Sequence, residues 1–177
     1  GMRLWNAGKR SAPAQPDMTG VVSGNRITAL GKTAQVEIPR NAQVINARNQ
    51  FMIPGLWDMH IHAFIRSRKS FPLYVMNLFL ANGVTGIRDM GSPGERDDFG
   101  DFPYVQDLEW RQALDSGAVL GPRLSLALTV VNGARAPGYP RQWAAVGNAA
   151  DARQEVISLK KLGADVIKVY DQLSRDS

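Results

Sequence analysis

The feature that most constrains the fold of this chain is a regular alternation that begins at residue 51. Apolar segments of strand length alternate from there with longer segments of helical character. We expect strands at 54–62, 83–89, 123–131 and 166–170 and helices at 71–81, 104–116 and 149–162. Strands joined by helical crossovers form parallel sheets with right-handed connections. The chain from 51 to 177 is therefore predicted to be α/β, with four parallel strands and three helices.

The first fifty residues have a different pattern, that of short strands without helices. Val21–Val22 and the segment 26–30 flank Ser23-Gly24-Asn25, which is typical of a hairpin turn. Segments 36–38 and 43–46 are further strand candidates, and 9–17 is expected to be a loop. We therefore predict a small β domain over 1–50 and a separate α/β domain over 51–177.

Composition excludes several classes of function. The chain has 177 residues and no cysteine, so it can form neither disulfides nor thiolate metal sites, and it has no cysteine nucleophile. Its net charge is +5, but the basic residues are scattered except for a cluster at 66–69, which does not favour nucleic-acid binding. No apolar run approaches the ~20 residues of a membrane span. We expect a cytoplasmic protein that binds neither nucleic acid nor membrane.

The strongest chemical signal is the pair of histidines, His60 and His62, which are the only two in the chain. Alternate side chains of a strand share one face, so the two imidazoles are expected to point the same way, roughly 7 Å apart along the backbone. Two imidazoles in this arrangement can bind one divalent metal ion. The flanking residues Leu56, Trp57, Met59 and Ile61 are apolar, as a buried strand requires.

The stretch 54–62, Pro-Gly-Leu-Trp-Asp-Met-His-Ile-His, resembles the first barrel strand of the amidohydrolase superfamily of metal-dependent hydrolases. Segments 84–91, 121–124 and 163–170 are similar to the imidazolonepropionase-like and Xaa-Pro dipeptidase-like branch, and residues 1–50 resemble its small β domain. Asn46 and Asn49 depart from the aspartate and glycine common there. The resemblance implies the first half of a TIM-type (β/α)8 barrel, one or two divalent metal ions, with zinc expected, and hydrolysis of carbon–nitrogen bonds.

Lys168 is a second candidate metal ligand. It lies within the apolar segment 166–170, and a lysine that faces a barrel interior loses solvent, which favours its neutral amine. A neutral amine can react with carbon dioxide to give a carbamate, whose oxygens can bridge two metals. The resemblance implies this role for a lysine at the end of the fourth strand. The alternative is a lysine whose stem packs on apolar surface while its ammonium group reaches water.

Three further residues are candidates for supporting roles. Asp58 shares the histidines' strand face and could orient an imidazole, or it could simply bond to backbone groups. Arg88 lies at the carboxyl end of the second strand, where parallel barrels carry their chemistry. Arg66 follows the histidine strand, and either arginine could bind a substrate carboxylate; a solvated loop is the alternative for Arg66. No residue is assigned as the catalytic acid or base.

The chain is expected to be the N-terminal part of such an enzyme and inactive alone. The resemblance implies further ligands, two histidines and an aspartate from later strands, but the chain ends just past its fourth strand. An intact enzyme would act on a small amide or dipeptide substrate. Two alternatives are a homo-oligomer that closes a barrel by pairing edge strands, and a non-catalytic fragment of the same fold that binds another protein.

Overall fold

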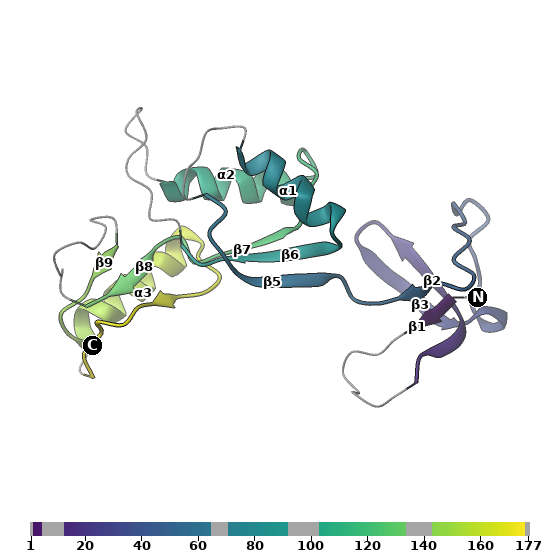
Figure 1. The fold of residues 1–177 in the computed structure, drawn as a ribbon, viewed down its shortest axis with the longest axis horizontal. Helices are drawn as coiled ribbons and strands as arrows, with labels where there is room; N and C mark the ends of the chain where they lie inside the picture. Colours follow the sequence, from purple (N-terminus) through teal and green to yellow (C-terminus); the bar gives the residue numbers. More distant parts are fainter. Residues whose placement is uncertain (1, 5–12, 65–70, 92–102, 134–142, 176–177) are drawn as a thin grey trace. The chain divides into compact units, whose positions relative to one another are not determined.

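The computed structural model describes the chain except for residues 1, 5–12, 65–70, 92–102, 134–142 and 176–177 (Figure 1). It divides into two compact units, Gly1–Pro54 and Gly55–Ser177. Each unit is considered by itself. Among the described residues, no helix combines the length and apolar character needed to cross a bilayer.

The first unit is a four-stranded sheet. Its strands are β1 (Met2–Leu4), β2 (Gln15–Ser23), β3 (Arg26–Lys32) and β4 (Phe51–Met52), in the order β3-β2-β1-β4, and a 3-10 helix, η1 (Thr33–Gln35), follows β3. The predicted hairpin is confirmed, because β2 and β3 pair antiparallel around Gly24, whose φ of 59° only glycine adopts easily. β4 pairs parallel with β1, so the segment that leads into the histidine strand belongs to this sheet.

Three local predictions for the first unit are wrong. Segments 36–38 and 43–46 form no strand, and their apolar side chains stay exposed, at 46% for Ile38, 70% for Val44 and 82% for Ile45. The place beside β1 in the sheet is taken by β4 instead. The predicted loop is also too long, because its last residues, from Gln15, already belong to β2.

The second unit begins with a parallel three-stranded sheet in the order β5-β6-β7. β5 (Leu56–Ile61) carries the first histidine, β6 (Val84–Asp89) follows helix α1 (Phe71–Ala81), and β7 (Arg123–Leu126) follows helix α2 (Pro103–Asp115). The predicted helices at 71–81 and 104–116 are confirmed. Gly83 and Gly117 end them with φ of 76° each, the left-handed conformation typical of helix C-termini.

The predicted third strand is interrupted in the structure. It splits at Leu128, a non-glycine residue with φ of 66°, into β7 and β8 (Val130–Asn132). β8 lies between β9 (Ala144–Ala145) and β10 (Lys168–Val169), and both pairings are parallel. The predicted single four-stranded sheet is thus two three-stranded sheets, and the predicted strand 166–170 is shortened to β10.

Helix α3 (Ala149–Leu162) is bounded by strong capping interactions. The side chain of Asn148 accepts hydrogen bonds from the backbone amides of Ala150 and Asp151, at 2.9 and 3.0 Å. Gly163 ends the helix with φ of 103°, and its amide bonds back to the carbonyls of residues 159 and 160. Both boundaries agree with the predicted helix at 149–162, and Asn before a helix and Gly after it are favoured capping residues.

One continuous core holds the second unit together. Its buried members come from α1 and α3, from strands β6, β7 and β8, and from the break between β7 and β8: Met76, Ile87, Leu124, Leu126, Leu128, Val131 and Leu159. Arg111 adds a polar connection, since its guanidinium donates to the Gly163 carbonyl at 2.8 Å and to the Asp165 carboxylate at 2.9 Å. The candidate residues of this unit lie towards the carboxyl ends of β5 and β6 and at the first residue of β10.

Candidate metal centre

His60 and His62 lie side by side at the carboxyl end of β5. Their ring centroids are 5.4 Å apart and the ring planes make an angle of 63°. The two side chains therefore share one side of the strand, as the alternation of residues predicts. Both residues are exposed, so the imidazoles remain accessible to a ligand from solution.

The ring of His62 is held in one orientation by a backbone carbonyl. Its Nδ1 lies 2.7 Å from the carbonyl oxygen of Gly91. A carbonyl can only accept, so Nδ1 must carry the proton in this contact. In the neutral ring Nε2 then keeps its lone pair, which is the form that binds a metal ion.

The carboxylate of Asp89 joins the ends of β5 and β6. Its two oxygens accept hydrogen bonds from the amide of Ala63, at 2.6 Å, and from the amide of Gly91, at 3.0 Å. The side chain is fully buried, and burial raises the pKa of Asp89, although the two amides and nearby His62 act in the opposite direction. Asp89 is the last residue of β6, and the sequence gave no indication of these bonds.

Lys168 is the first residue of β10 and is half-buried. Its Nζ is 5.9 Å from the centre of the Tyr170 ring, and that ring lies 4.9 Å from the ring of Trp143. Lys168 pairs across the sheet with Val130. A Cβ built on Gly91 would lie 3.3 Å from the Val130 side chain, so Gly91, which bonds to His62, packs directly against the strand beside Lys168.

The other candidates either bond to backbone groups or lie outside the residues that the structure describes. The carboxylate of Asp58 accepts a hydrogen bond from the backbone amide of His60, at 3.1 Å. The Nε of Arg88 donates to the carbonyl of Met59 on the neighbouring strand, at 2.7 Å. Arg66 lies outside the described residues. The roles of Asp58 in orienting an imidazole and of the arginines in binding substrate stay predictions.

Asp107, on α2, is a buried carboxyl that the sequence analysis missed. It is 0% exposed, and neither of its oxygens has a hydrogen-bond partner. Burial, with a smaller contribution from the charge of Asp89, raises the pKa of Asp107 to about 8. The available signal was its spacing from Trp110 and Leu114, three and seven residues later, which places a polar residue on the apolar side of the helix.

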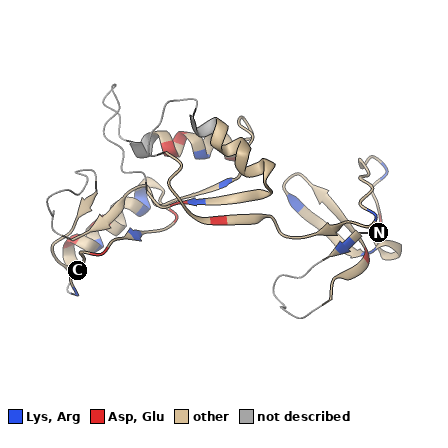
Figure 2. Ribbon diagram, viewed as in Figure 1, with Lys and Arg blue, Asp and Glu red and all other residues tan. Residues whose placement is uncertain are grey.

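The donors present fit part of a metal site. Two imidazoles and an amine convertible to a carbamate are ligands that zinc accepts, whereas a zinc site needs about three protein ligands and a water. The described residues contain no group of three or more His, Asp or Glu side chains that could hold a metal by themselves. Lysine and arginine positions are interspersed with acidic positions along the described ribbon (Figure 2).

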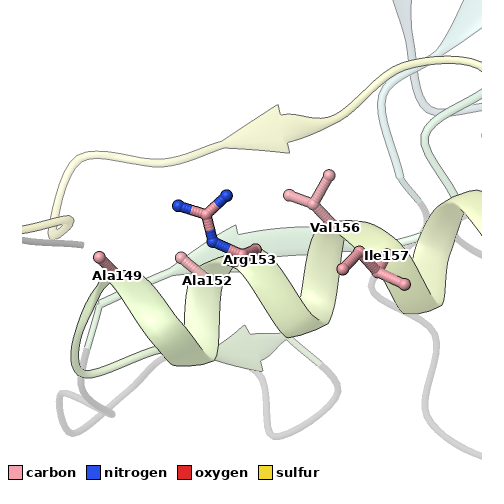
Figure 3. A pocket seen from close by; sticks show the side chains of 5 residues that line it. All are labelled: Ala149, Ala152, Arg153, Val156 and Ile157. Atoms are coloured by element: carbon pink, nitrogen blue, oxygen red, sulfur yellow. The ribbon is translucent and has the colours of Figure 1, made fainter.

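A shallow open hollow of about 550 Å³ lies elsewhere, along one side of α3 (Figure 3). It is lined by Ala149, Ala152, Arg153, Val156 and Ile157. None of these is a candidate ligand, and the lining is largely aliphatic. The hollow therefore does not compete with the histidine pair as a site of chemistry.

No protein-family model matches the chain. Comparison with curated proteins finds a related sequence. The dihydroorotase of Mycobacterium leprae (strain TN) is 29% identical over 119 residues, which is 67% of this chain and 25% of that enzyme. The chain thus spans a quarter of the length of this relative.

Solved structures with the same fold include a prolidase, an amidohydrolase and a Xaa-Pro dipeptidase. A prolidase in complex with N-methylphosphonate-L-proline superposes with a TM-score of 0.71 at 20% identity, covering 96% of this chain and 45% of the prolidase. An amidohydrolase gives 0.71 at 20% identity over 94% and 44%. A Xaa-Pro dipeptidase with bound methionine gives 0.60 at 20% identity over 94% and 45%. The resemblance inferred from the sequence is confirmed at the level of the fold, over less than half of each of these proteins.

Proposed function

We propose that this chain supplies part of a metal-dependent hydrolase of the amidohydrolase superfamily, which cleaves carbon–nitrogen bonds in amides, cyclic amides or peptides. The observation that carries the proposal is the histidine pair at the end of β5, with rings 5.4 Å apart and the His62 Nδ1 bonded to a carbonyl. The shared fold of a prolidase and an amidohydrolase supports it.

The second unit is the first half of a (β/α)8 barrel in this proposal. Its parallel strands follow one another in chain order, with α1, α2 and α3 as the crossovers between them. The break at Leu128 supports the idea, because the first part of the third strand pairs with β6 and the second part with β10. The four predicted strands are therefore neighbours in order, although their ladders are discontinuous.

His60 and His62 would hold one divalent metal ion, with zinc our choice, and Lys168 as a carbamate would bridge it to a second. When bound, the metal activates a water and polarises the carbonyl that the water attacks. To form the carbamate, the neutral Lys168 amine adds to the carbon of carbon dioxide, and one proton leaves the nitrogen for solvent. Gly91 keeps the proton of His62 on Nδ1, away from the metal side of the ring.

This chain by itself is proposed to be inactive towards a small amide or dipeptide substrate. The proposed ligands are two imidazoles and one lysine, and the described residues contain no group of three or more His, Asp or Glu side chains there, so the attacking water has no evident base among them. The alternative is a non-catalytic fragment of the same fold that oligomerises or binds another protein. The observation favouring it is the exposure of three apolar side chains on β5, Leu56, Trp57 and Met59.

Metal titration tests the proposal. The chain is expected to bind Zn²⁺ or Co²⁺ in a dialysed sample, and His60→Gln or His62→Gln should each weaken binding at least tenfold, because each removes a ligand. Met59→Gln is the matched control, since Met59 directly precedes His60 but points to the other side of the strand. Equal binding by all four proteins, or no binding by the wild type, would contradict the metal site.

The carbamate is tested separately. Added bicarbonate should strengthen metal binding by the wild type but not by Lys168→Arg, because a guanidinium does not add to carbon dioxide. Native mass spectrometry should detect a carbon dioxide adduct in the wild type alone. An effect of bicarbonate that is the same in both proteins would exclude Lys168 as its target.

A further inference from the structure

The bonds around Asp89 form a relay that ends at Nδ1 of His62, on the side of the ring away from the metal. One oxygen of Asp89 accepts from the amide of Ala63, the residue directly after His62, at 2.6 Å. The other oxygen accepts a hydrogen bond from the amide of Gly91 at 3.0 Å. The carbonyl of Gly91 in turn accepts a hydrogen bond from His62 Nδ1 at 2.7 Å. One buried carboxylate thus fixes both the backbone of the histidine and the group that orients its ring.

We propose that Asp89 is the positioning residue of the metal site, holding His62 in the tautomer and orientation that present Nε2 to the metal. It touches neither metal nor substrate. The inference rests on the proposed function for its metal, but the tautomer it predicts exists in the metal-free protein.

The geometry of Gly91 shows why the Asp89 carboxylate is needed. Gly91 has φ of 93°, a conformation that other residues rarely adopt, and a Cβ there would lie 3.1 Å from the carbonyl carbon of Thr129. A peptide in this conformation is outside the regular ladder of β6 and needs another restraint. The bond from its amide to Asp89 supplies that restraint at a residue whose carbonyl bonds to His62.

Asp89→Asn is the test variant, with Asp107→Asn as its matched control. The carboxamide has one acceptor oxygen where the carboxylate has two, and its amino group would face a backbone amide, so one of the two bonds is lost. Asp107 is another fully buried carboxyl near Asp89 but has no bond in the relay. Both variants remove a buried carboxyl, but only Asp89→Asn should disturb His62.

The primary measurement is the tautomer of each histidine by nitrogen NMR on the full metal-free chain. Because the chain has two histidines, the spectrum contains two rings, and His60 serves as an internal reference. We expect His62 to be the Nδ1–H tautomer in the wild type and in Asp107→Asn, and a mixture in Asp89→Asn. Zn²⁺ affinity should fall about 10- to 100-fold in Asp89→Asn, the usual effect of losing a ligand-orienting group, and stay unchanged in the control.

The outcomes separate this inference from the proposed function. If the wild type binds no metal and Asp89→Asn still changes the His62 tautomer, the metal site fails and the positioning role stands. If His62→Gln weakens Zn²⁺ binding while Asp89→Asn leaves both affinity and tautomer unchanged, the positioning role is overturned. An Nε2–H tautomer of His62 in the wild type would overturn it as well, and this measurement does not depend on how any variant folds.

Discussion

Two carboxyl groups buried in the second unit differ in what surrounds them. Asp89 has an amide donor at each oxygen, whereas Asp107 has no hydrogen-bond partner at either. A buried carboxylate without donors is costly, so Asp107 takes up a proton instead of remaining charged. Its pKa of about 8 means that it is mostly neutral at pH 7.

This protonation should make stability depend on pH. The folded pKa of about 8 exceeds the usual value of 3.8, so between these values the folded state holds a proton that the unfolded state has released. The free energy of unfolding should therefore fall as pH rises through this window, by up to about 1.4 kcal/mol per pH unit, and level off above it.

Asp107→Asn isolates this effect, because an amide does not titrate in this range. Urea unfolding at several pH values should show the variant gaining stability relative to the wild type as pH rises from about 4 to about 8. A difference between the two proteins that is constant with pH would show that Asp107 keeps an ordinary pKa in the folded chain.

Residue patterns predicted the histidine pair but not the groups that orient it. Alternation along a strand fixes which side chains share a face, and it therefore placed His60 and His62 together. The contacts of His62 with Gly91 and of Asp89 with Ala63 connect different strands and depend on a peptide with positive φ. No spacing within a single segment contains that information.

At the scale of elements, helix boundaries were predictable because their determinants are local. The determinants are the side chain of Asn148, the left-handed Gly163 and the glycines after α1 and α2. Each acts within one or two turns of its own helix. Strand limits depended on partners far away in sequence. The apolar run 123–131 reads as one strand, yet Leu128 turns it so that its two parts have different neighbours.

The cap of α3 gives a direct test at this scale. Asn148→Ala removes the acceptor of two backbone amides, and we expect it to lower the free energy of unfolding by about 1 kcal/mol. Asn148→Ser keeps a capping oxygen and should recover most of the loss. Chemical denaturation of the three proteins gives the values, and equal losses in both variants would mean that the cap contributes little.

At the scale of the whole molecule, the second unit leaves apolar strand surface exposed. β5 is an end strand of its sheet, and Leu56 on it is 52% exposed. An end strand with apolar side chains is a template for pairing with another chain. The chain covers 45% of the prolidase and 45% of the Xaa-Pro dipeptidase that share its fold.

We predict that the isolated chain self-associates through β5. Leu56→Lys should reduce the weight-average mass in sedimentation velocity at high protein concentration, because a lysine on an end strand opposes pairing. Leu120→Lys is the control, since Leu120 is 75% exposed but lies outside the strands. A monomer at every concentration, or an equal effect of both lysines, would rule out association by this edge.

The left-handed Leu128 also bears on how such a chain tolerates insertions. One extra residue beside this break could be absorbed by the irregular backbone, so that Val130 and its successors keep the faces they now present. The same insertion just before Arg88 would reverse the parity of the rest of β6 and put a guanidinium where the Asp89 carboxylate now lies. Length variation in evolution should thus accumulate at the joint of the third strand and be purged from the second.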